Sequence, residues 1–234
     1  MGKLMRPMTW ALVLFVLAAN QQAQAQSTSY TSSAAYNAAL AGIPNQSTMV
    51  EDYGTGFSAG DLINNGSTFH GLTYQFVATP TLSGGIITNQ FNSFSGLSLG
   101  GNQSNGAAQF FFDGDQFSVT FSQPVYAVGL FFNVNANSGN FGLNTSVGSA
   151  VTGSAAYDTS TFVFAGLIST DPFNSASFFS NSGGNGTASY NVPEITFTIS
   201  SVPEPSSLVL SGIAVIVGLM VTWVRVRRRS LTSA

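Results

Sequence analysis

The sequence predicts an all-β fold: a single β-sandwich, with a jelly roll as the first topology and a Greek-key sandwich as the second. Three observations favour this class. At least eight short segments have the apolar and polar pattern of strands, and two of them, 117–121 and 195–199, alternate strictly. Clusters of Gly, Asn and Ser separate the segments as turns and loops do. Nineteen of the 20 Phe residues lie within 26–201, many of them alternating with polar residues, and they supply a core for one domain over this region.

The elements follow in order along this region. Residues 26–33 are expected to form a short flexible lead, and the alanine-rich segment 33–40 one helix that ends near Gly42 and Pro44. Asp113, Gly114 and Asp115 are predicted to form a tight turn between two strands. Strands are expected at 48–53, 68–78, 108–112, 116–122, 125–134, 161–169, 176–180 and 194–200, and loops at 83–85, 100–106, 137–142 and 181–186.

The charge distribution excludes several classes of function. All six Lys and Arg residues lie outside 26–201, whereas eight of the nine acidic residues lie inside it. Such a region cannot clamp phosphates with ion pairs, so no nucleic-acid partner is expected. The chain has no cysteine, which excludes disulfides, thiol catalysis and thiolate zinc sites. A region of low charge that is rich in Ser, Thr, Asn and Gly presents a surface that suits hydrogen bonding with water and sugars.

The first 25 residues are predicted to be a cleaved secretory signal peptide. Lys3 and Arg6 precede an apolar stretch over 10–19, which is too short for a comfortable membrane span. Ala23 and Ala25 then form a small-x-small cleavage site. We therefore expect export by the Sec machinery, with the mature chain beginning near Gln26.

The C-terminal region has the properties of a membrane-anchoring segment. Residues 208–224 carry no charge and are just long enough for a short transmembrane helix. A basic stop follows, and its arginines should remain cytoplasmic together with residues 230–234. The prolines on either side of Glu204 favour an extended, exposed segment before the span. The basic stop consists of Arg225, Arg227, Arg228 and Arg229.

These residues resemble the PEP-CTERM sorting signal of Gram-negative bacteria. The resemblance rests on three features in order over 202–229: a short Pro-Glu-Pro motif, the apolar span and the arginine cluster. It implies an exosortase substrate whose precursor is held briefly in the inner membrane and then reaches the cell surface or is secreted. A plain single-pass anchor with a proline-rich stalk is the alternative interpretation. The sorting motif consists of Val202, Pro203, Glu204 and Pro205.

A second resemblance concerns the region between the two signals. Segments 121–130, 164–169 and 172–178 are similar to sandwich ectodomains that often carry this sorting signal and that are lectin-like or carbohydrate-binding in general shape. Such ectodomains often end in an Asp-rich strand. Here that stretch is Asn191, Val192, Pro193 and Glu194, which departs from the pattern. The resemblance specifies a fold rather than a ligand.

Candidate catalytic chemistry is sparse. His70, the only histidine, would have to serve any Ser-His-Asp triad, and it is predicted to lie on the surface of a strand opposite a buried Phe69. Glycoside hydrolysis needs two carboxylates across a site, but Glu51 and Asp52 are neighbours expected to point to opposite faces of a strand. We therefore expect no catalytic residues and no enzyme activity.

Calcium is the one cofactor that the sequence leaves open. Asp113 and Asp115 offer carboxylate oxygens without a competing Lys, and they can supply part of a site or simply cap a turn. The sequence as a whole predicts a non-catalytic protein of the cell surface or extracellular polymeric matrix. The alternative is a carbohydrate-binding surface module, with calcium or without it, whose partner is exopolysaccharide.

Overall fold

The computed structural model describes most of the region between the two predicted signals, namely residues 26–44, 46–77, 79, 82–90, 93–104, 109–112, 114–135, 140–152, 161–181 and 189–200. The predicted signal peptide and its cleavage site, the sorting motif, the span and the basic stop all lie outside these residues. Within the described part of the chain, none of the helical structure is long and apolar enough to cross a bilayer.

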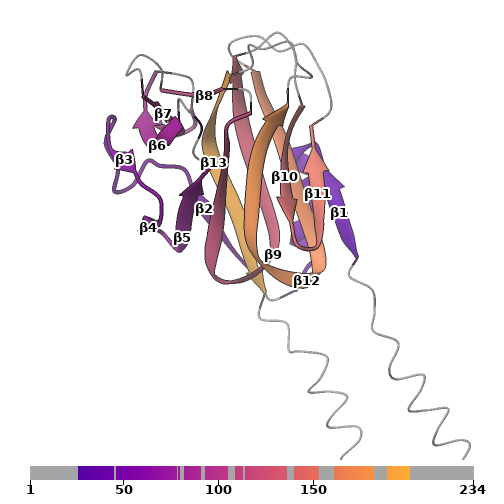
Figure 1. The fold of residues 1–234 in the computed structure, drawn as a ribbon. Helices are drawn as coiled ribbons and strands as arrows, with labels where there is room; N and C mark the ends of the chain where they lie inside the picture. Colours follow the sequence, from indigo (N-terminus) through magenta and orange to yellow (C-terminus); the bar gives the residue numbers. More distant parts are fainter. Residues whose placement is uncertain are drawn as a thin grey trace, which may run out of the picture.

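The described residues form one short helix and a sheet of 13 strands (Figure 1). In chain order the elements are β1 (Ser27–Tyr30), α2 (Ser33–Ala41), β2 (Gln46–Glu51), β3 (Leu62–Ile63), β4 (Thr68–Phe69), β5 (Leu72–Phe76), β6 (Leu82–Thr88), β7 (Ser98–Gln103), β8 (Phe111–Phe112), β9 (Gln116–Asn135), β10 (Asn140–Thr145), β11 (Gly148–Val151), β12 (Thr161–Asn181) and β13 (Ser189–Ser200).

Two long strands, β9 and β12, each belong to both layers of a sandwich. Their register runs from Thr161 opposite Val134 in one layer to Phe179 opposite Gln116 in the other, with shifts on either side of Phe173. In the first layer this pair is flanked by β1 and by β13, which in turn pairs with β2; we call this the helix layer. In the second it is flanked by β10, which pairs with β11, and by β5, which pairs with β4; we call this the groove layer.

The hydrophobic core lies between these two layers. Phe117 and Val119 of β9 face it from the groove layer, and Leu130 and Phe132 of the same strand face it from the helix layer. Rings meet across the interface, as in Phe132 and Phe141, whose centroids are 5.4 Å apart. The prediction of an all-β sandwich is confirmed, and the core is built almost entirely from aromatic and branched aliphatic side chains.

The helix packs on the outer face of the helix layer. Ser32 caps its N-terminus by accepting a hydrogen bond from Ala35 N at 3.5 Å, and Tyr36 and Leu40 are its buried residues. Tyr36 lies over Gly129 and Gly166, which are direct partners in the β9–β12 register. The predicted helix over 33–40 is confirmed, and it ends at Ala41 just before Gly42.

Several predicted boundaries were wrong. Segments 116–122 and 125–134 are one strand, β9, and segments 161–169 and 176–180 are one strand, β12. Pro124 and Pro172 misled the prediction, because both lie where these strands bend from one layer into the other, a position that tolerates a missing N–H donor. The expected flexible lead contains β1, which pairs with β12.

Three glycine-rich segments predicted as loops contain strands instead. β6 covers all of the predicted loop 83–85, β7 covers residues 100–103 of the predicted loop 100–106, and β10 covers residues 140–142 of the predicted loop 137–142. The glycines are there because neighbours approach closely. A Cβ on Gly85 would lie 2.6 Å from Phe76 Cζ, and one on Gly142 would lie 2.8 Å from Phe179 Cζ.

Candidate ligand-binding face

The outer face of the groove layer is an ordered array of uncharged polar side chains. Strand alternation buries Phe117, Val119 and Phe121 of β9 and turns the residues between them outward. The strand registers place these outward residues side by side across four strands. One row is Asn144, Ser177, Ser118 and Gln75, and the next contains Ser175, Thr120, Thr73 and Thr68.

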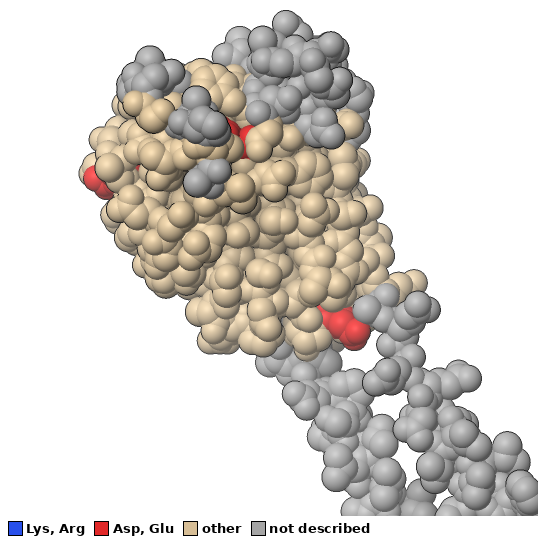
Figure 2. Space-filling model, in the orientation of Figure 1, with Lys and Arg blue, Asp and Glu red and all other residues tan. Residues whose placement is uncertain are grey.

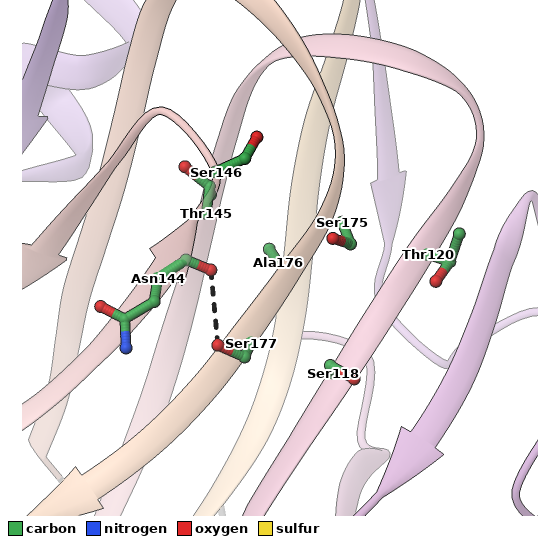
Figure 3. A pocket seen from close by; sticks show the side chains of 8 residues that line it. All are labelled: Ser118, Thr120, Asn144, Thr145, Ser146, Ser175, Ala176 and Ser177. Atoms are coloured by element: carbon green, nitrogen blue, oxygen red, sulfur yellow. Dashed lines mark hydrogen bonds between the residues drawn. The ribbon is translucent and has the colours of Figure 1, made fainter.

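A shallow groove of about 400 Å³ crosses this face between the bodies of β9 and β12 and the turn that joins β10 to β11 (Figure 3). The turn forms one wall. Its shape is fixed by Thr145, whose hydroxyl donates to Gly148 O at 3.0 Å and accepts from Val147 N at 3.2 Å. Ser177 Oγ donates to Asn144 O at 3.5 Å beneath it. The lining residues are Ser118, Thr120, Asn144, Thr145, Ser146, Ser175, Ala176 and Ser177.

The chemistry of this groove is that of a neutral hydrogen-bonding surface. Hydroxyl groups both donate and accept, and the amide of Asn144 does the same. None of the lining residues is ionisable, so the groove offers no general acid, base or charged metal ligand. Figure 2 shows that the surrounding described surface is also poor in charge: Asp and Glu are few and scattered, and no Lys or Arg is seen.

Asp115 is a buried residue whose hydrogen bonds stabilise the fold. It is 2% exposed, and its carboxylate accepts hydrogen bonds from Phe112 N at 2.9 Å, Gln103 Nε2 at 3.0 Å and Thr79 Oγ1 at 3.2 Å. Its own N–H donates to Phe112 O, which closes the predicted tight turn between β8 and β9. Asp113 lies outside the described residues. Among the residues that are described, no three His, Cys, Asp or Glu side chains cluster as a metal site would require.

His70 occupies a turn rather than the predicted strand. It lies between β4 and β5 with a φ of +47°, and its Nδ1 is 2.6 Å from Glu51 Oε2. The other carboxylate oxygen of Glu51 accepts from Tyr53 N at 2.8 Å, and Tyr53 also has a positive φ, of +60°. One buried carboxylate thus contacts two residues in the left-handed region, whereas the neighbouring Asp52 is partly exposed.

Glu194 is the remaining acidic residue singled out by the sequence. It follows a register shift in β13 between Asn191 and Glu194, where Pro193 interrupts the pairing. Its side chain lies on the outer face of the helix layer, and Thr196 Oγ1 donates to its Oε1 at 3.1 Å. Partial burial raises the pKa of the Glu194 carboxyl, the Thr196 hydrogen bond opposes this, and the nearby Asp52 adds to the rise.

Sequence reasoning did not find the groove. Serine and threonine on the solvent face of a strand are ordinary, and only the register shows that residues from β9, β10 and β12 share one patch. A usable signal was present in the alternation itself. Residues 118 and 120, and residues 175 and 177, are polar positions between core residues in strands that the sequence did predict in part.

Comparison with known proteins concerns mainly the C-terminal segment. Residues 201–229 match the family model of the PEP-CTERM protein-sorting motif, which confirms the resemblance. The motif marks an exported protein that is anchored by a C-terminal membrane segment before exosortase processing and that then reaches the cell surface. No curated protein matches the sequence.

Among solved structures, two similar chains are mutants of family 29 carbohydrate-binding modules. One has a TM-score of 0.32 at 9% identity and covers 68% of this chain and 99% of its own. The other, complexed with mannohexaose, has a TM-score of 0.32 at 12% identity and covers 66% of this chain and 93% of its own.

Proposed function

We propose that this chain is a non-catalytic protein of the cell surface or extracellular polymeric matrix, and that its groove layer binds neutral polysaccharide. The observation that carries the proposal is the array of uncharged donors and acceptors around the groove of about 400 Å³. Within each row, neighbouring residues lie one strand spacing apart, about 4.8 Å, so the face presents hydroxyl and amide groups at regular intervals. A polysaccharide presents its own hydroxyl groups at regular intervals along its length.

Charge supports a neutral rather than an acidic ligand. Residues 26–201 carry eight acidic residues and no Lys or Arg, so an anionic polymer would be repelled and would meet no cationic partner. A neutral polymer has neither disadvantage. Hydrogen bonds between uncharged groups each contribute about 1 kcal/mol net. A useful affinity therefore requires several of them, which a face of this size provides.

Lack of catalysis is part of the proposal. Glu51, one of the two carboxylates considered for hydrolysis, is buried against His70 and Tyr53, and Asp115 closes a turn. Neither lines the groove. We expect the polysaccharide to be held without being cleaved, and its chain length to stay constant during prolonged incubation with the protein.

The test is binding of the full chain, kept in a detergent without a sugar headgroup, to beads that carry neutral polysaccharide from the matrix of the producing cells. Thr120→Val combined with Ser177→Ala removes two groove hydroxyls with little change of shape, and should weaken retention about tenfold or more. Thr28→Val, an exposed strand position on β1, is the matched control and should bind normally. Equal retention of the groove variant, or stronger retention on acidic polygalacturonate beads, would refute the proposal.

A further inference from the structure

The outer face of the helix layer carries a row of aromatic rings that is buried at one end and exposed at the other. Tyr36 of α2 contacts Phe164 with ring centroids 5.2 Å apart, and Phe164 contacts Phe131 at 5.1 Å. Phe131 contacts Phe94 edge to face at 4.9 Å, and Phe94 stacks on Phe162 at 4.8 Å. The side chain of Phe94 is 53% exposed, so the row ends at the surface of the protein.

Phe94 is held in this exposed position by the segment around it. Ser95 Oγ donates to Asp52 O at 2.5 Å, which ties the segment to the end of β2. The contact is close, because a Cβ on Gly54 would lie 2.8 Å from Ser95 Cβ. An aromatic ring fixed at the surface keeps apolar area in contact with water, and burying that area against a ligand is favourable by about 25 cal/mol per Å².

One carboxylate lies beside the rings, and a second belongs to the neighbouring strand end. Glu194 is the direct register partner of Phe131, and both side chains lie on the outer face, because Ile195 and Leu130 beside them belong to the core. Partners in such a pair have Cβ atoms about 5 Å apart. Asp52 follows β2, whose last residue pairs with Ile195, so its backbone comes next to Glu194. Phe131 therefore lies beside a partly desolvated hydrogen-bond acceptor, the Glu194 carboxylate.

This combination fits a saccharide better than another macromolecule. A pyranose ring has an apolar face of C–H groups that stacks on an aromatic ring, and hydroxyl groups at its edge that donate to carboxylates. Anionic lipids and acidic polymers would be repelled by Glu194 and Asp52. A second copy of this chain docking about a twofold axis would bring these carboxylates toward their own equivalents, with no Lys or Arg in residues 26–201 to offset them.

We propose that Phe94, Phe162 and Glu194 form a second saccharide-binding site, which stacks a pyranose of a neutral polysaccharide on the exposed ring and accepts hydrogen bonds from its hydroxyl groups. The site lies on the opposite outer face of the sandwich from the groove. The inference rests on the proposed polysaccharide-binding function and extends it. With one site on each outer face, a single molecule can join two polysaccharide chains.

The experiment places a reporter in the site. Phe94→Trp introduces an indole at the proposed stacking position, and the two natural tryptophans, Trp10 and Trp223, give a background that the unsubstituted chain measures. The full chain in the same detergent is titrated with the neutral matrix polysaccharide, alone and in the Thr120→Val, Ser177→Ala background. We expect the indole fluorescence to change and saturate in both backgrounds.

Further variants of Phe94 distinguish stacking of a pyranose on its ring from a purely structural role in which the side chain covers Phe131. Phe94→Leu still covers Phe131 but has no aromatic face, so it should weaken binding of the groove variant about tenfold, whereas Phe94→Tyr should retain it. Leu62→Ala, which alters a side chain of similar exposure (52%) on β3, should have no effect.

The outcomes separate the two proposals. If the wild-type chain binds through the groove but the indole signal stays flat and Phe94→Leu binds normally, the second site does not exist and the groove proposal stands. If no version of the protein binds the polysaccharide, both proposals fall. If Phe94→Leu leaves binding unchanged but lowers the sedimenting mass, the exposed rings contact another copy of the chain, and the inference is wrong.

Discussion

Gly166 lies at the tightest point between α2 and the sheet, and replacing it with alanine tests whether this packing is as close as the structure indicates. A Cβ at this position would lie 2.7 Å from Phe164 Cε1 and 2.7 Å from Tyr36 Cδ2. Both rings are buried, so neither can turn away into solvent. The neighbouring Gly129 is equally restricted, because its own Cβ would lie 2.6 Å from Phe164 Cζ.

The expected cost follows from these contacts. Inserting one methyl group into a packed site costs about 1–3 kcal/mol, because side chains must leave their rotamers or the backbone must shift. For a protein of this size each kcal/mol lowers the melting temperature by about 2–4 °C, so Gly166→Ala should lower it by about 2–12 °C. Gly42→Ala is the control, because a Cβ there meets only Ala39 O at 3.4 Å, an ordinary contact.

The assay is thermal and urea-induced unfolding of the full chain in detergent, followed by circular dichroism at the β-sheet signal. A second measurement is proteolysis of α2, which should become faster in Gly166→Ala if the helix is displaced from the layer. The predicted destabilisation is refuted if Gly166→Ala has the same melting temperature as the wild-type chain, or if Gly42→Ala lowers it by the same amount. In either case the close packing of Tyr36 and Phe164 on the glycine pair contributes no measurable constraint on stability.

The remaining predictions concern three acidic residues. The pKa of the Glu194 carboxyl is raised above its ordinary value of 4.5, so the folded protein binds the carboxyl proton more tightly than the unfolded chain does. The free energy of unfolding therefore falls as the pH rises above 4.5, where the unfolded chain loses this proton first. Glu194→Gln should flatten that fall in melts between about pH 3 and pH 7, and an unchanged pH profile would count against the burial of this carboxyl. Asp115→Asn should lower the free energy of unfolding in urea by about 1–3 kcal/mol, because an amide N–H₂ would face donors that now meet a carboxylate. Calcium should not raise the melting temperature of the wild-type chain or of this variant. A calcium-dependent rise that is lost in the variant would instead indicate a metal site. Glu204→Ala should leave a membrane-retained precursor on fractionation, and normal maturation would contradict exosortase recognition of the motif.

The sequence predicted the fold class because the relevant signals are local. Alternation over 117–121 and 195–199 is visible within one segment, and the alanine-rich helix with its terminal Gly42 is too. The continuity of β9 and β12 was not predictable in this way. Pro124 and Pro172 are ordinary strand breakers, and only the neighbouring layer shows that each lies at a bend within a longer strand.

The glycine-rich strands show a different difficulty. Gly85 and Gly142 have the composition of loops, and the reason for their small size is a ring from another strand, which no local pattern contains. The groove and the exposed ring of Phe94 were missed for the same reason, because each is assembled by pairing between distant segments. The contact of the half-exposed His70 with the buried Glu51 depends likewise on a turn and a strand end that meet only in the folded chain.

The sharing of β9 and β12 between the two layers has a mechanical consequence. The layers cannot be peeled apart one after the other, because each contains part of the same two strands. A pulling force that enters through the end of β13 meets a strand hydrogen-bonded on both sides, to β9 and to β2, so many bonds are loaded together in shear. Under tension such a sandwich should resist up to a high force and then give way in one step.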